Sequence, residues 1–224
     1  MRGALRTDNG GFSQVIAIVD YKAGNLTSVR LAFESIGASA RILRDPDGIR
    51  ACDKVLFPGV GAAGAAMKNL RELGLEPVLR ERVAAGVPFL GICLGTQILF
   101  ERSEEDGGID CLGLLRGRVR RFVARNHAEK IPEMGWNQVK IARRHPLLSG
   151  IPDGSDFYFV HSFYPAPDES ANVVGTTNYC GVEFASMVGR GNLAATQFHP
   201  EKSGRIGLRL LANFAAWDGS SEAV

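Results

Sequence analysis

A cysteine flanked by glycines is the position in this sequence where nucleophilic chemistry is easiest to place. Gly91, Cys93 and Gly95 come directly after an apolar run and directly before residues that can form a helix. A nucleophile elbow is a strand-to-helix turn so tight that only small residues fit two positions on either side of the reactive side chain. In such a turn the helix dipole favours the thiolate of Cys93, and the backbone N–H of Leu94 would point toward an oxyanion. For Cys93 alone, a buried apolar thiol without a chemical role is an equally open interpretation.

A histidine and a glutamate two residues apart form the second candidate. His199 and Glu201 flank Pro200 at the end of an expected strand, and alternate residues of a strand project to the same side. A carboxylate beside an imidazole fixes its tautomer and stabilises the protonated ring. Taken alone, such a pair is more often an ordinary polar contact at a strand end. Together with Cys93 it supplies a nucleophile, a base and an orienting acid, and parallel α/β sheets gather their sites where strands end.

A glycine-rich loop at residues 57–64 is ambiguous. It has the spacing G-x-G-x-x-G between a strand and a helix, which is typical of a dinucleotide-binding loop. That fingerprint also needs an acidic residue about 20 positions later at the end of a strand, whereas Glu76 and Glu81 fall in a helical pattern. Pro58 stiffens the turn as well. We therefore favour the alternative, in which the backbone of residues 59–61 donates an N–H to an oxyanion.

The other histidines are weaker candidates. His127 and His145 lie in polar, loop-like sequence, where we expect solvated side chains. His161 ends an expected strand, and it either lines a site or is a satisfied core imidazole. No group of residues has the spacing of metal ligands, so we expect neither a metal nor another cofactor.

The elements that must position these residues alternate between strand and helix in the first half of the chain. Such alternation implies right-handed βαβ crossovers and a mostly parallel sheet. Continuous apolar runs predict strands at 15–19, 40–43, 54–57 and 88–92, and helical periodicity predicts helices at 26–36, at 46–51 and twice between 62 and 85, with a further helix-compatible stretch at 96–101.

Beyond Gly107 the segments are shorter and divided by glycines, which indicates antiparallel strands added to the sheet or its edge. These strands are expected at 117–123, 137–141, 157–160, 173–177, 182–188 and 193–198, followed by a final helix at 206–217. The sequence thus predicts an α/β fold of three layers, with a mostly parallel central sheet, helices on both faces and added antiparallel strands.

The composition favours a single globular domain whose core needs no disulfide or metal. The chain has 224 residues, 45% of them hydrophobic, and its 26 basic and 24 acidic side chains leave a formal net charge of +2. This small charge argues against nucleic acid as a partner, and the most apolar stretch, 87–100, is too short and too often broken to span a membrane. We expect a flexible tail at 1–14, one domain at 15–218 and a second tail at 219–224.

The cysteines are spaced neither as a CxxC pair nor as a dense disulfide framework. They are Cys52, Cys93, Cys111 and Cys180. We therefore expect reduced thiols and a cytoplasmic protein.

The motifs together resemble the class I, or triad, glutamine amidotransferases. The elbow GICLGTQ (91–97) and the segment QFHPEK (197–202) are similar to the two signatures of that family, and they occur in the family's order. Segments at 19–26, at 58–61 (PGVG) and at 132–137 (PEMGWN) narrow the resemblance to the glutaminase subunits of imidazole glycerol phosphate synthases, from histidine biosynthesis. It covers about residues 15–217 and implies the family's flavodoxin-like arrangement without a cofactor. Lys22 and Ala23 depart from it, because the family's first turn more often begins with glycine.

The resemblance implies a role for each matching residue. Cys93 would attack the carboxamide of glutamine, His199 would act as general base and then acid, and Glu201 would orient His199. The oxyanion hole would be formed by Gly59, Val60 and Leu94, once a peptide of the Gly59–Val60 loop reorients. The residues that would contact substrate are Gln97, Ser162 and Phe163. Those that would contact the partner are Asn25, Trp136, Tyr158 and Lys202. The ammonia would pass to a (β/α)8-barrel cyclase, which forms a heterodimer with the glutaminase and makes imidazole glycerol phosphate and an aminoimidazole carboxamide ribotide.

Three other functions stay open. An amidotransferase serving another synthase would share the triad and differ in its partner. A cysteine-dependent α/β-hydrolase is disfavoured because its acid should precede the histidine, whereas Glu201 follows His199. A non-enzymatic flavodoxin-like binding module would hold Cys93 buried and inert.

Overall fold

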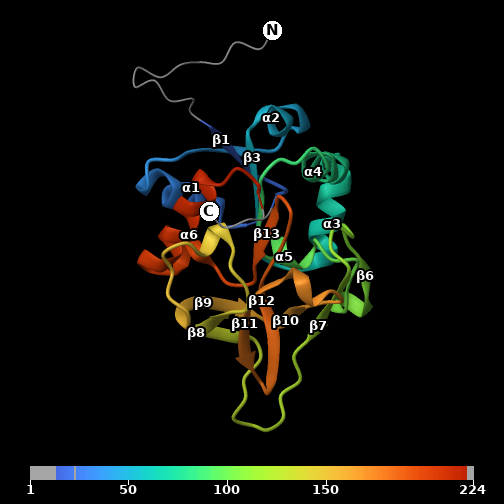
Figure 1. Cartoon of the computed structure of the whole chain (residues 1–224). Coiled ribbons are helices and arrows are strands. Elements are labelled where there is room, and N and C mark those ends of the chain that lie inside the picture. Colours follow the sequence, from blue (N-terminus) through green and yellow to red (C-terminus); the bar gives the residue numbers. More distant parts are fainter. Residues whose placement is uncertain (1–13, 23, 221–224) are drawn as a thin grey trace.

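A nine-stranded mixed sheet runs through the centre of the molecule (Figure 1). The computed structural model describes residues 14–22 and 24–220. The expected tail at 1–14 therefore lies, apart from Gln14, outside the described residues, as do Ala23 and positions 221–224 of the expected C-terminal tail. Along the sheet the strands follow the order β2-β1-β3-β4-β13-β12-β11-β8-β9.

The half of the sheet that begins at β2 is parallel. Its strands are β1 (Val15–Val19), β2 (Ser39–Leu43), β3 (Lys54–Gly59), β4 (Phe89–Cys93) and β13 (Leu193–Thr196). Every residue of β3, β4 and β13 is buried. Because both faces of these strands are covered, continuous apolar runs predicted β3 and β4. The strand β13 was expected among the antiparallel additions, whereas it pairs parallel with β4 and antiparallel only with β12.

Helices cover both faces of the parallel half (Figure 1). The helices on one face are α1 (Leu26–Ser35) and α6 (Gly204–Ala216), and those on the other are α2 (Pro46–Ala51), α3 (Ala63–Glu72) and α4 (Leu75–Ala84). Ile16 and Ile18 of β1 point into the core beneath α1 and α6. Ala17 and Val19 point into the core beneath the other helices. This alternation confirms the three layers that the sequence predicted.

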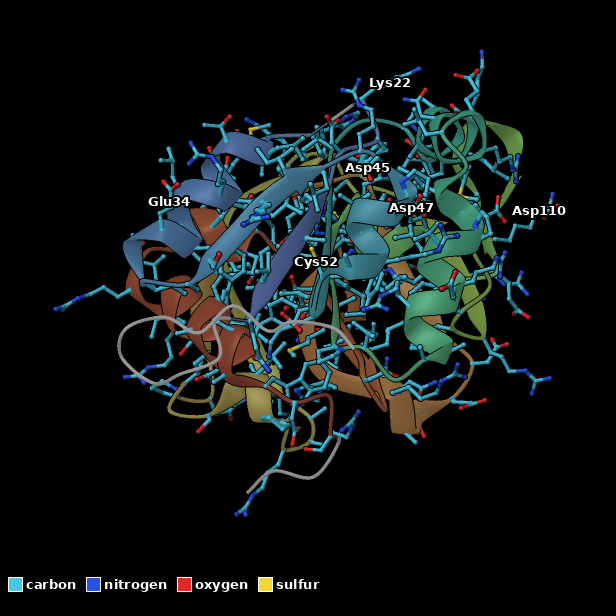
Figure 2. The ribbon with its side chains drawn as sticks, turned by 90° about the horizontal axis from the view of Figure 1, so that it is seen from above. Lys22, Glu34, Asp45, Asp47, Cys52 and Asp110 are labelled. Atoms are coloured by element: carbon cyan, nitrogen blue, oxygen red, sulfur yellow. The ribbon has the colours of Figure 1, made fainter. Side chains whose placement is uncertain are left out.

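The start of α2 shows how local sequence sets an element. Asp45 lies at the start of this helix (Figure 2). Pro46 occupies the first helical position, and the carboxylate of Asp45 accepts the N–H of Gly48. The predicted bounds, 46–51, are those of the structure.

Antiparallel strands complete the nine-stranded sheet, and a second, four-stranded sheet is mixed. The large sheet gains β12 (Val182–Arg190), β11 (Val173–Tyr179), β8 (Glu133–Ile141) and β9 (Ser155–His161). The small sheet contains β10 (Phe163–Pro167), β7 (Gly117–Arg121), β5 (Arg102–Ser103) and β6 (Ile109–Asp110). In it β5 pairs parallel with β7, while the other pairs are antiparallel. Single turns of 3₁₀ helix lie at η1 (Glu105–Gly107), η2 (Pro146–Leu148), η3 (Ser170–Asn172) and η4 (Pro200–Lys202).

Two local features differ from the sequence-based expectation. The strand β10 was missed because it contains Pro165 and Pro167, which it tolerates because it lies at the edge of its sheet. The helix expected at 96–101 is wrong, since α5 spans only Leu94–Gln97. The carbonyls of Ile98 and Phe100 instead accept the N–H groups of Leu112 and Gly113 at 2.8 and 2.7 Å, so a loop uses the acceptors that a longer helix would need.

In the part of the chain that the structure describes, no helix is long and apolar enough to cross a membrane.

Candidate active site

The backbone of Cys93 forms the tight turn that the sequence predicted. Cys93 is the last residue of β4 and directly precedes α5, and its φ of 55° and ψ of −110° are unusual for a residue with a side chain. A Cβ atom added to Gly95 would lie 2.0 Å from the carbonyl oxygen of Phe57. One added to Gly91 would lie 2.9 Å from the carbonyl oxygen of Gly95. The two glycines therefore permit the turn that presents the thiol.

The His199–Glu201 pair lies beside this turn because β13 is the parallel neighbour of β4, with Thr196 opposite Ile92. The Nδ1 atom of His199 lies 2.8 Å from Oε1 of Glu201, and both side chains are almost completely buried. The spacing predicted that both residues lie on a strand, and this is wrong. The chain leaves β13 before His199, and η4 turns the carboxylate of Glu201 back toward the ring.

The charge of His199 is set by its surroundings. Burial on its own lowers the pKa of this imidazole, but the negative charge of Cys93 and the carboxylate of Glu201 outweigh it and raise the pKa to about 10. The buried Nε2 atom has no aligned hydrogen-bond partner among the residues that the structure describes, and the sulfur raises the pKa of the ring chiefly through its charge. This arrangement favours a protonated imidazole beside the sulfur.

Two glutamine side chains surround the thiol. The Sγ atom of Cys93 lies 3.7 Å from Nε2 of Gln197 and 3.8 Å from the carbonyl oxygen of Val160. The Nε2 atom of Gln97 donates to Oε1 of Gln197 at 3.1 Å and to the carbonyl oxygen of Phe163 at 3.0 Å. The sequence pattern predicted no role for Gln197, although its position two residues before His199 is a signal that could have found it.

A cavity of about 340 Å³ opens beside Cys93 and is large enough for an amino acid. The residues expected to hold substrate or an oxyanion that line it are Val60, Leu94, Gln97, Ser162 and Phe163. Cys93 and His199 complete its reactive wall. The glycine-rich loop thus contributes to the same cavity as the thiol.

Val60 does not direct its N–H group into this cavity. The N–H donates to the hydroxyl oxygen of Tyr21 at 3.3 Å, on the buried side of the loop. Gly59 is packed tightly there, because an added Cβ would lie 2.8 Å from the Cβ of Leu94. Gly59, Val60 and Leu94 are therefore neighbours, as expected, but the N–H of Val60 points away from the cavity.

A second imidazole–carboxylate pair borders the cavity. His161 lines it, and the Nε2 atom of His161 lies 3.0 Å from Oε2 of Glu133 in an ion-pair contact without aligned hydrogen-bond geometry. The Nδ1 atom of His161 lies 2.7 Å from the carbonyl oxygen of Phe163 and must donate to it, since a carbonyl only accepts. The other carboxylate oxygen of Glu133 accepts from Asn137 at 2.7 Å. Of the two interpretations left open for His161, the first holds, because it lines the cavity; the second does not, because only Nδ1 is hydrogen-bonded and the buried Nε2 has no hydrogen-bond partner among the described residues.

The two remaining histidines differ from each other. His127 is exposed, as expected. The expectation for His145 is wrong, because its side chain is buried against Trp217, with ring centroids 5.3 Å apart, and its Nδ1 accepts the N–H of Leu147. Burial and the positive charge of Arg143 lower the pKa of His145 to about 4. Its place as the cap of a short turn could not be recognised from polar neighbours alone.

Three of the expected partner-facing residues form one cluster. Trp136 is 59% exposed and its ring meets that of Tyr158 edge to face, at 6.1 Å between centroids. The Nζ atom of Lys202 lies 5.8 Å from the Tyr158 ring centroid. The fourth residue, Asn25, is exposed at the start of α1, which packs against η4. We call Trp136, Tyr158 and Lys202 the aromatic cluster.

A family model described as glutamine amidotransferase class-I matches residues 14–216. Among similar proteins, the imidazole glycerol phosphate synthase subunit HisH of Nitrosococcus oceani is 51% identical over 208 residues, which cover 92% of this chain and 99% of that protein. The subunit of the same name from Chloroflexus aurantiacus is 49% identical, covering 94% of this chain and 98% of that protein.

Solved structures support the fold at lower identity. The structure of PurLQS from Thermotoga maritima matches with a TM-score of 0.71 and 19% identity, covering 91% of this chain and 98% of that chain. A structure titled glutamine amidotransferase matches with a TM-score of 0.70 and 21% identity, covering 91% and 98% of the two chains.

Proposed function

This chain belongs to the class I glutamine amidotransferases, and from that premise we propose that it is the glutaminase subunit of an imidazole glycerol phosphate synthase. It hydrolyses glutamine to glutamate and ammonia. The observation that carries this proposal is the buried group of three side chains, in which Glu201 lies 2.8 Å from the ring of His199 and the charge of Cys93 acts on that ring.

We propose that the reaction begins with the thiolate of Cys93. Its sulfur forms a bond to the carboxamide carbon of glutamine, and the carbonyl electrons move onto oxygen. The protonated His199 then donates its Nε2 proton to the nitrogen, the C–N bond breaks and ammonia leaves. Glu201 keeps the ring oriented and stabilises its positive charge.

The thioester is then hydrolysed by water. Neutral His199 accepts a proton from the water, whose oxygen attacks the acyl carbon, and the C–S bond breaks to release glutamate and restore the thiolate. Leu94 and Val60 would each offer an N–H to the oxyanion of both tetrahedral intermediates, and each well-placed donor is worth roughly 2.7–4 kcal/mol. Gly59 gives the loop room to present Val60.

We assign substrate binding to the opposite wall of the cavity. Gln97, four residues after Cys93, places its side-chain amide there, and Ser162 and Phe163 offer backbone groups for the α-carboxylate of glutamine. The hydrogen bond from Gln97 to the carbonyl oxygen of Phe163 ties these two binding segments together.

The ammonia is passed to a partner. We propose a (β/α)8-barrel cyclase that forms a heterodimer with this chain and uses the ammonia to form imidazole glycerol phosphate and an aminoimidazole carboxamide ribotide. The exposed aromatic cluster supports a docking surface, because aromatic side chains are enriched at the centres of interfaces. The cysteines are all unpaired, which supports work in the reducing cytoplasm.

The deciding experiment measures glutamine hydrolysis by the purified chain, alone and with the cyclase and its ribonucleotide substrate. We expect slow hydrolysis alone and a marked increase in the complex. The Cys93→Ala variant should lose glutamine-dependent synthesis but keep synthesis driven by added ammonia. A complex that hydrolyses no glutamine would overturn the proposal, and activation by a different synthase instead would reassign the partner.

A further inference from the structure

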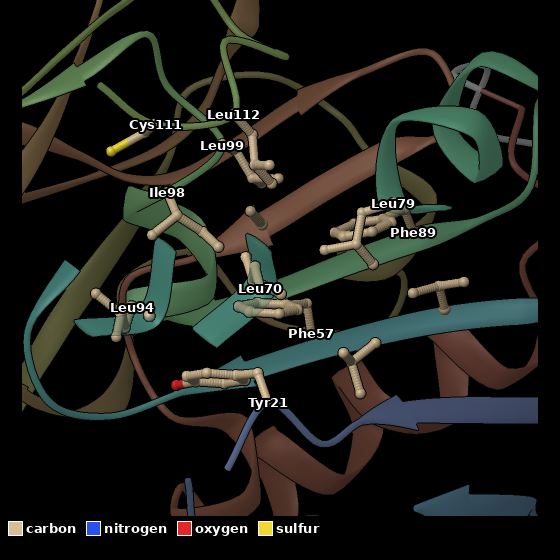
Figure 3. Close-up of a cluster of buried hydrophobic side chains, with 14 of the residues drawn as sticks. Tyr21, Phe57, Leu70, Leu79, Phe89, Leu94, Ile98, Leu99, Cys111 and Leu112 are labelled. Atoms are coloured by element: carbon tan, nitrogen blue, oxygen red, sulfur yellow. The ribbon is translucent and has the colours of Figure 1, made fainter. Parts of the chain in front are cut away.

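Tyr21 contacts the backbone of Val60 from the buried side of the loop. Tyr21 follows β1 and is fully buried, and its ring stacks on Phe57 with centroids 4.9 Å apart and planes 21° apart (Figure 3). The hydroxyl oxygen accepts the N–H of Val60 at 3.3 Å, and the hydroxyl donates to the carbonyl oxygen of Val60 at 3.4 Å. One hydroxyl group thus contacts both peptide groups that flank Val60.

These contacts decide where the N–H of Val60 points. An N–H directed at the buried oxygen of Tyr21 cannot at the same time be directed at an oxyanion in the cavity. The side chain of Val60 is 39% exposed and lines the cavity, whereas Tyr21 has no exposed surface. The donor and the place where it would be needed therefore lie on opposite sides of the loop.

We propose that the hydroxyl of Tyr21 is a latch, which holds the N–H of Val60 away from the cavity in the isolated subunit and so keeps the oxyanion hole incomplete. The inference rests on the proposed glutaminase function. Tyr21 touches neither substrate nor the reacting atoms, so it is a positioning residue that acts through Val60.

The surroundings of Tyr21 suit a latch. Burial, opposed by the contact with Val60 and assisted by the negative charge of Cys93, raises the pKa of Tyr21 to about 12, so the hydroxyl keeps its proton and can donate and accept together. The stacked ring of Phe57 fixes the position of the hydroxyl. Gly59 lets the loop approach, because an added Cβ there would lie 3.0 Å from the hydroxyl oxygen.

The latch also lies close to a surface that a partner could reach. Tyr21 is followed directly by Lys22, whose side chain is exposed (Figure 2) and whose φ is +68°. Lys22 pairs with Glu72 of α3 at 3.8 Å. A cyclase that contacts Lys22 would act on the chain one residue away from the hydroxyl and weaken its hold on Val60.

The test removes the hydroxyl and keeps the ring. Relative to wild type, the Tyr21→Phe subunit without cyclase should hydrolyse glutamine about 3- to 10-fold faster, the effect of losing the two long, neutral hydrogen bonds that favour the resting loop. The increase should lie in kcat, with KM for glutamine unchanged, because only a contact to the oxyanion is gained. Because the rate of the complex should stay the same, the ratio of the rate in the complex to the rate of the subunit alone should fall by the same factor.

Matched variants separate the hydroxyl from the packing. Tyr179→Phe removes a hydroxyl that bonds to the carbonyl of Lys130, and it should leave the basal rate unchanged. Tyr21→Leu removes the ring together with the hydroxyl, and a rise in Tyr21→Leu without a rise in a folded Tyr21→Phe would assign the effect to the packing and overturn the latch. Tyr21→Leu also lacks the hydroxyl and decides the question if Tyr21→Phe does not fold.

The outcomes for the latch and for the proposed function differ. If the wild-type complex hydrolyses glutamine but no variant lacking the Tyr21 hydroxyl has a raised basal rate, the latch is wrong and the glutaminase function stands. If the wild-type complex hydrolyses no glutamine, the function itself fails.

Discussion

His161 and Glu133 face each other across the β8–β9 pair, with Nε2 and Oε2 3.0 Å apart and both side chains almost completely buried. The strand that carries Glu133 also carries Trp136 of the aromatic cluster, and the strand that carries His161 also carries Tyr158. One pair of strands therefore joins the expected partner surface to the cavity beside Cys93.

The Glu133→Gln variant tests what this pair does. Replacing the carboxylate by an amide takes away the buried polar partner of Nε2 of His161, so the free energy of unfolding should fall by about 1–3 kcal/mol. The segment from His161 to Phe163 should loosen, and KM for glutamine should rise several-fold. Denaturant unfolding and steady-state kinetics measure the two effects. The control Glu34→Gln alters an exposed pair with Arg30 and should change neither, and lowered stability with an unchanged KM would give the buried pair a purely structural role.

The Cys93→Ala variant should change the titration of His199. The folded-state pKa of about 10 lies above the ordinary value of 6.5, so this group's contribution to stability is complete below pH 6.5 and is lost as the pH rises toward 10. Without the charge of Cys93, the pKa of His199 should be lower in the folded state. Its contribution to stability should therefore be lost at lower pH. Nitrogen NMR of the imidazole and unfolding across this pH range measure both effects. Cys111→Ala removes another buried thiol and should leave the titration unchanged, and identical curves for wild type and Cys93→Ala would show that the thiol does not act on the ring.

The His199→Asn variant tests the base. An electrophile shaped like glutamine should alkylate Cys93 at neutral pH at least about 100-fold more slowly in this variant, because the imidazole that favours the thiolate is gone. Mass spectrometry of the labelled chain gives the rate. His127→Asn replaces an exposed imidazole and should label like the wild type. Equal labelling in His199→Asn would remove His199 from the mechanism.

Gly95→Ala tests the turn that presents the thiol. The new Cβ would lie 2.0 Å from the carbonyl oxygen of Phe57, so the backbone must move, and we expect stability to fall by about 3 kcal/mol or more. Gly37→Ala is the comparison, since Gly37 has a φ of +74° but open space around it and should lose only about 1–2 kcal/mol. Thermal and denaturant unfolding measure the free energy of unfolding of both variants. Equal decreases would show that the backbone around Gly95 can move at little cost in stability.

The sequence predicted those features that depend on local pattern or on strand order. The run from Val15 to Val19 predicted β1, and the helical pattern at 46–51 predicted α2. The meeting of Cys93 with His199 followed from one rule, that parallel strands gather their ends at one edge, and the structure places these residues at neighbouring strands.

The contacts that the sequence did not predict depend on register and packing. The facing of Glu133 and His161 needs the pairing of β8 with β9, which no local pattern encodes. The contact of Tyr21 with Val60 depends on how β1 and β3 lie side by side and on the stacking against Phe57. His145 is buried because its ring packs against Trp217, which is distant in the sequence.

The place of β13 in the sheet has a consequence for biosynthesis. This strand, the last of the described strands to leave the ribosome, inserts between β4 and β12 and brings His199 with it. During synthesis Cys93, and the β8–β9 pair that carries Trp136 and Tyr158, leave the ribosome before His199 does. A nascent chain therefore holds its thiol without the neighbouring imidazole until β13 and the residues after it have been made.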